Sequence, residues 1–215
     1  MVTIIRPSDH TPLAPGRRAP AGGRASALTC DFTQAWRWAM LLGMPHVLTH
    51  RDSPFINFKE FDFPDGRGHG YRWVHIKRFH LPDDPPADQD LLAALIAHPE
   101  FRDTYDGAGV WHEPRHGQWW SDRISPGTYT AMDESSATGT IHSWATGGVP
   151  LPPDLEARLH EAVYTPIHRA TSRYALRSLP EDAHHDYGPI HIEFHELVII
   201  DRRAGTLALL VAADD

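Results

Sequence analysis

The sequence predicts an α+β fold: a mostly antiparallel, curved sheet, open or barrel-like, with about three helices. Helical and strand-like segments follow one another without the regular β-α-β order of a parallel sheet. Residues 55–63 and 71–79 are strand-like and flank a turn rich in glycine and aspartate, which is typical of a hairpin. The chain ends with two more strand-like segments, 189–200 and 206–213, whose short linker favours antiparallel pairing.

The length of 215 residues suits one domain with an appended segment. Residues 11–27 are rich in proline, glycine, alanine and arginine and carry no apolar period. We therefore expect residues 1–27 to be flexible or loosely packed and residues 28–215 to form a single α+β domain. The one cysteine, Cys30, excludes an internal disulfide and a cysteine-based zinc cluster.

Three segments carry the apolar spacing of a helix. The first covers about 31–42, where Asp31 supplies a capping side chain. The second covers 88–97, with leucine and isoleucine along one side. The third begins at Pro153, and Pro166 is expected to break or kink it before a helical pattern resumes.

The middle of the chain, residues 107–145, is rich in glycine, tryptophan and threonine. Its composition favours two or three strands, near Val110, at 127–132 and at 139–145. The polar residues 133–136 fit a turn between two of these strands. The segment 206–213 is continuously apolar, as expected of a strand buried on both faces.

Composition narrows the classes of function. The net charge is −8, with 28 acidic against 20 basic residues, and the basic clusters are short. Nucleic-acid binding is not expected, because it needs several clustered cations. No signal peptide and no run of membrane-spanning length is visible. These features favour a soluble cytoplasmic protein. We further expect an enzyme of bacterial type that acts on a small molecule, with a homodimer as one possible assembly.

The richest chemistry lies between His184 and Glu196, where seven of thirteen residues can bind a metal or move a proton. His191, Glu193 and His195 alternate with apolar residues, which places them on one face of a strand. The next two residues on that face are apolar. We therefore expect the strand to begin in a polar cavity and to end in the core, although surface pairs across strands would give a similar pattern.

Strand geometry limits how these residues could hold a metal. Four residues of strand separate His191 from His195 by about 13 Å, too far for both to bind one ion. One adjacent pair, either His191 with Glu193 or Glu193 with His195, could ligate. His75 and His142 are the candidate ligands from other strands, because each lies in a segment with aromatic neighbours. Two histidines and one carboxylate would suit a mononuclear iron(II) or zinc centre with open positions.

Three functions remain open from the sequence. The first is a metal-dependent oxygenase, lyase or isomerase acting on a small organic molecule, with Glu193, His195 and His185 as catalytic groups. The second is a lyase, isomerase or cyclase that uses the same histidine and glutamate chemistry without a metal. The third is a non-enzymatic module that binds a ligand or a protein through its tryptophans.

Residues 112–116 read HEPRH, the letters of a zinc-protease motif. The motif requires a helix, but Pro114 lies inside it and glycines flank it. We therefore expect a loop instead. His112 and His116, with the neighbouring tryptophans, would then form either the wall of a site or a core cluster.

Overall fold

The computed structural model describes residues 47–63, 70–106, 114–188 and 191–214. All of them belong to one compact unit, Met44–Asp215. The expected N-terminal segment 1–27, the helix at 31–42 and the strand near Val110 lie outside the described residues.

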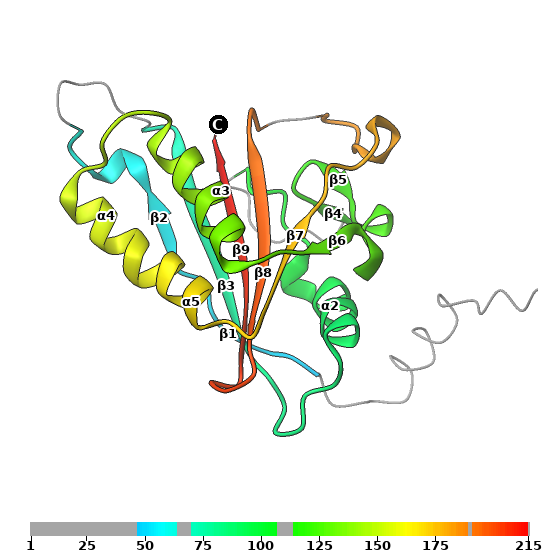
Figure 1. Ribbon diagram of the computed structural model, residues 1–215. Helices are drawn as coiled ribbons and strands as arrows, with labels where there is room; N and C mark the ends of the chain where they lie inside the picture. Colours follow the sequence, from blue (N-terminus) through cyan, green and yellow to red (C-terminus); the bar gives the residue numbers. More distant parts are fainter. Residues whose placement is uncertain (1–46, 64–69, 107–113, 189–190, 215) are drawn as a thin grey trace, which may run out of the picture. The chain divides into compact units, whose positions relative to one another are not determined.

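An antiparallel sheet of seven strands forms the centre of this unit, in the order β1-β3-β9-β8-β7-β6, with β2 also paired to β3 (Figure 1). The sheet is open rather than closed into a barrel, and the predicted α+β class is confirmed. Its strands are β1 (Thr49–Asp52), β2 (Phe55–Asn57), β3 (Arg72–His80), β6 (Tyr129–Ala131), β7 (Ser172–Leu176), β8 (Phe194–Asp201) and β9 (Thr206–Asp214).

Helices and a small hairpin cover the sheet. The helices are α2 (Asp88–Ala97), α3 (Glu134–Thr146), α4 (Pro153–Leu159) and α5 (Thr165–Arg169), and the π-helical turn η6 (His160–Tyr164) joins the last two. The hairpin consists of β4 (Arg115–His116) and β5 (Trp119–Trp120). Short 3-10 turns complete the fold at η1 (Phe58–Glu60), η3 (Pro99–Phe101), η4 (Ser121–Arg123), η5 (Pro126–Thr128) and η7 (Glu181–Ala183).

Each face of the sheet has its own apolar layer. On the helical face, α3, α4 and α5 pack their buried side chains against Val74, Ile76 and Leu197. On the opposite face, which we call the hairpin face, α2 and the β4–β5 hairpin pack against Phe79 and Val198. Figure 1 shows α3, α4 and α5 to one side of β8 and β9, and α2 with the hairpin to the other. None of the helices in the described ranges has the length and apolar character needed to cross a membrane.

The expected strand at 139–145 is wrong, because these residues belong to α3. Asp133 caps the helix by accepting a hydrogen bond from the Ser136 amide at 2.7 Å. Gly147 ends it in the left-handed region, at φ 49°. Ile141 and Trp144 fit a strand by composition, but together with Ala137 they follow a helical spacing and face the sheet.

Two further boundaries differ from expectation. The helix that begins at Pro153 continues to Arg169 instead of breaking at Pro166, which lies in the first turn of α5. In a continuous helix the N–H that this proline lacks would bond to an earlier carbonyl, and the π-helical turn η6 directly before it accommodates the missing bond. The expected helical continuation after Arg169 is instead the strand β7.

The C-terminal and β2–β3 hairpins are confirmed as antiparallel pairs. However, β8 begins at Phe194, so His191 and Glu193 precede the strand. Of the three residues that we expected in one strand, only His195 therefore lies in β8.

The burial pattern of α3 predicts the cost of two neighbouring substitutions. Ile141→Ala should lower the free energy of unfolding by about 2–5 kcal/mol, because it leaves a cavity at a fully buried position. His142→Ala should change it by less than about 0.5 kcal/mol, because that side chain is exposed. Urea unfolding measures both, and equal losses in the two variants would contradict the helical placement.

Candidate functional site

Ionisable side chains are buried at the centre of the hairpin face, where apolar side chains are expected. Burying such groups costs free energy unless each finds a partner, so their concentration in one place marks a candidate functional site. The buried members are Lys77, Asp103, Tyr105, His116, Tyr129 and Glu196.

Strand pairing aligns the histidine of β3 with the glutamate of β8. His75 lies opposite Val211 of β9, and Val211 lies opposite Glu196. On the outer side, His75 lies opposite Phe55 of β2. Directly paired residues point to the same face, so all four form one row across the sheet. Two strand spacings, about 10 Å, separate His75 from Glu196.

An ion pair anchors the loop between η3 and the hairpin to β3. Lys77 Nζ lies 2.7 Å from Asp103 Oδ2, and both side chains are almost fully buried. Lys77 also donates to the Glu100 carbonyl at 2.6 Å. The backbone carbonyl of Asp103 accepts from the Gly117 amide at 2.8 Å. One aspartate thus connects the strand, the loop and the β4–β5 hairpin.

Tyr105 is held in a strained conformation beside this pair. Its φ is +60°, and it is the only non-glycine residue of the described segments with a positive φ. Its amide donates to Asp103 Oδ1 at 2.8 Å, and Lys77 Nζ lies 5.2 Å from its ring centroid. Among the described residues, its buried hydroxyl has no hydrogen-bond partner. Burial, with the charge of Glu196, raises the pKa of Tyr105 well above its ordinary value.

His75 is the ionisable member of the row that solvent reaches. Its side chain is 20% exposed, and its Nδ1 lies 3.9 Å from Asp103 Oδ2. Burial and then the charge of Lys77 lower the pKa of His75 below 6.5, against the opposing effect of Asp103. The imidazole is therefore neutral at pH 7, and one of its ring nitrogens is free to accept a proton.

A three-residue hydrogen-bonded group occupies the inner end of the row. His116 Nδ1 contacts the Phe101 carbonyl oxygen, so that nitrogen must carry a hydrogen. Its Nε2 lies 2.5 Å from Glu196 Oε2, so the two side chains form a hydrogen bond. Tyr129 donates its hydroxyl to Glu196 Oε1. Burial, followed by the charge of Glu196, raises the pKa of Tyr129 well above 10, which keeps it a donor.

The hairpin presents His116 to this group through a close backbone approach. Gly117 has φ +54°, and a Cβ on it would lie 2.7 Å from the Phe194 ring. Only glycine fits there. Because Arg115–His116 is a strand, the described part of this motif is not the helix that a zinc-protease motif requires. Of this motif, His112 lies outside the described residues, and His116 belongs to the buried group.

The predicted pair of Glu193 and His195 is brought together. His195 Nε2 lies 3.1 Å from Glu193 Oε2. The His195 ring packs against Trp144 of α3, at 6.2 Å between centroids, which places it on the helical face. This pair is partly exposed and lies on the opposite face of the sheet from Glu196.

His191 lies on the hairpin face instead. Its ring is 5.5 Å from that of Trp73, and its Nδ1 and Nε2 lie 3.3 and 3.4 Å from the carbonyl oxygens of Asp214 and Thr104. The sequence had placed His191 and His195 on one face of a strand, and this expectation is wrong. The chain from residue 191 to Glu193 is not part of β8, so alternation does not apply to it.

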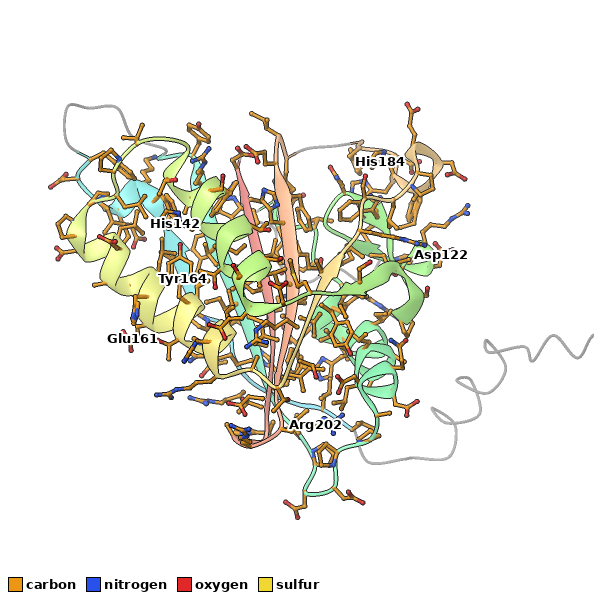
Figure 2. The ribbon with its side chains drawn as sticks, in the orientation of Figure 1. Asp122, His142, Glu161, Tyr164, His184 and Arg202 are labelled. Atoms are coloured by element: carbon orange, nitrogen blue, oxygen red, sulfur yellow. The ribbon has the colours of Figure 1, made fainter. Side chains whose placement is uncertain are left out.

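The remaining predicted site residues are separate from both groups. His185 is buried, and its Nε2 donates to the Gly117 carbonyl at 3.0 Å while its Nδ1 accepts from the Tyr187 amide. The hydrogen bond to Gly117 connects the loop that carries His185 to the β4–β5 hairpin. His142 is exposed on α3, and Figure 2 shows it beside Tyr164 on the helical side, away from His184.

No metal-binding group of three or more histidine, cysteine, aspartate or glutamate side chains occurs among the described residues. The predicted ligands His75, His142, His191 and Glu193 do not converge. The mononuclear iron or zinc centre therefore finds no support in this part of the chain.

Several members of the site were missed from the sequence, although two of them carried a signal. Lys77 and Glu196 are charged residues at inward positions of otherwise apolar strand faces. A charge at such a position needs a buried partner. The partners could not be found in this way, because Asp103 lies in a loop and Tyr129 in the edge strand β6, and their approach depends on the whole fold.

Comparison of the chain with family models, with curated proteins and with solved structures gives no match.

The buried hydrogen bond of Tyr129 predicts a specific loss of stability. Tyr129→Phe should lower the free energy of unfolding by about 1–3 kcal/mol, because Glu196 Oε1 loses its donor in a water-free site. The matched control is Tyr174→Phe, which removes a hydroxyl bound to Asp88 at a partly exposed position. The control should cost less than about 1 kcal/mol. Chemical unfolding distinguishes them, and a smaller loss for Tyr129→Phe than for the control would contradict the network.

The lowered pKa of His75 predicts a dependence of stability on pH. Below pH 6.5 the unfolded chain binds a proton at His75 before the folded chain does. The contribution of His75 to stability is therefore complete above pH 6.5 and decreases as the pH falls through its folded pKa. The free energy of unfolding, measured with urea, should decrease less between pH 7.5 and about pH 5 in His75→Gln than in the parent protein. An equal or larger loss in the variant would reverse the sign of the shift.

Proposed function

We propose that the protein is an enzyme that removes a proton from a small organic molecule without a metal, with His75 as the general base. The observation that carries the proposal is that His75 is neutral and solvent-accessible at the edge of a buried network of charges. General bases in enzymes need a pKa at or below the working pH and an open path to the substrate. The reaction class is that of a lyase or isomerase.

The surroundings of His75 suit an organic substrate. Phe55 is half exposed and its ring lies 5.7 Å from that of His75, in an edge-on arrangement. Trp73 stacks on Phe55 and on Tyr105, at 5.8 and 5.9 Å. Aromatic walls with few polar groups are typical of small-molecule sites.

The buried groups would support proton transfer in two ways. When His75 accepts a proton it becomes an imidazolium, and the Asp103 carboxylate 3.9 Å away would stabilise that charge. Lys77, bound to the same carboxylate, keeps His75 neutral until the proton arrives. The pair Asp103 and Lys77 would thus position and tune the base.

A metal-dependent reaction is the alternative proposal, and the experiment below separates the two. A bacterial source, a cytoplasmic location and a homodimer remain expectations from the sequence.

Exchange of deuterium from solvent into substrate tests the proposed function. Protein treated with a chelator is incubated in D₂O with a panel of small carbonyl compounds that carry an acidic C–H bond, and NMR follows the exchange. Exchange should persist after chelation and should fall about a hundredfold or more in His75→Gln. The control His142→Gln, on the helical face, should keep the parent rate. Exchange that requires added iron or zinc, or that survives in His75→Gln, would contradict the proposal.

A further inference from the structure

A second candidate site lies where α5 ends and β8 turns into β9. An open hollow of about 800 Å³ is lined there by His168, Arg169, Ala170, Thr171, Asp201, Arg203 and Ala204. Figure 2 shows this end of the molecule around the labelled Arg202. The residues that line the hollow are all distinct from those of the His75 row.

Most charges around the hollow already have partners. Arg173 donates to the carbonyls of Ile167, His168 and Ala170, so the C-terminal carbonyls of α5 need no other cation. Asp201 Oδ1 accepts from two backbone amides of the β8–β9 turn, each at 3.0 Å. Arg202 points to Asp88 instead, with Nη2 at 2.6 Å from Oδ1.

Arg169 and Arg203 are the exceptions. Within the described ranges, neither side chain makes a hydrogen bond or an ion pair, and both are exposed. The hollow therefore contains two guanidinium groups without partners in the described ranges and one carboxylate, Asp201, which accepts hydrogen bonds from the β8–β9 turn. This local excess of positive charge contrasts with the net charge of −8 of the whole chain.

We propose that this hollow binds the phosphate group of a small molecule through Arg169 and Arg203. Two arginines can hold one phosphate because each guanidinium presents paired donors that match its oxygens. The volume lies within the range of small-molecule sites. Thr171, which lines the hollow, is held in place, because its amide at 2.7 Å and its hydroxyl at 2.9 Å both donate to the Ile200 carbonyl.

The test is an NMR titration of the whole chain with inorganic phosphate, at an ionic strength held constant with chloride. The backbone amides of Thr171 and Ala204 should shift in a saturable way with a millimolar Kd. The double variant Arg169→Gln/Arg203→Gln should weaken binding by about tenfold or more, since it removes both charge-assisted contacts. Arg158→Gln, an exposed arginine of α4 whose ion-pair distance is 3.9 Å, is the matched control and should bind as the parent does.

Two results would overturn the proposal. One is the absence of any saturable shift at Thr171 and Ala204 in the parent protein, which needs no variant. The other is equal affinity in the double variant and the parent, which would mean that phosphate binds without these arginines. Neither result bears on the function proposed for His75.

Discussion

The buried ion pair of Lys77 and Asp103 is the interaction on which the rest of this site depends. It joins the central strand β3 to the loop that follows η3, and the same aspartate binds the amides of Tyr105 and Gly117. Breaking such a pair leaves an uncompensated charge in the core, at a cost of about 3–5 kcal/mol. The pair therefore fixes the loop, and the loop fixes the strained Tyr105 against the sheet.

The pair also determines how the two ends of the row differ. At the outer end, burial and then the charge of Lys77 lower the pKa of His75 and leave a neutral base near solvent. At the inner end, Glu196 and His116 satisfy each other in the dry interior, with Tyr129 as a further donor. Fully satisfied polar groups make a core rigid and specific. The inner group would thus hold the scaffold in place, while the outer histidine would act as the proposed general base.

Local patterns predicted much of the fold and little of the site. The helix at 88–97 and the final strand could be predicted because the first has a helical apolar spacing, the second is a continuous apolar run, and both have clear ends. The helix α3 was not predicted, because Ile141 and Trp144 fit a strand as well as a helix when the sheet beneath them is not known. The site was not predicted for the same reason: Asp103 reaches the sheet from a loop and His116 from the β4–β5 hairpin, and no spacing in the sequence encodes that approach.

The most direct test of this account is the titration of the His75 imidazole by NMR, in the parent protein and in Lys77→Met. The account predicts a midpoint below 6.5 in the parent, since burial and Lys77 both disfavour the charged ring. Removing Lys77 leaves the Asp103 carboxylate unopposed beside His75, so the midpoint should rise. A parent midpoint at or above 6.5, or a midpoint that does not rise in Lys77→Met, would contradict the role given to the ion pair.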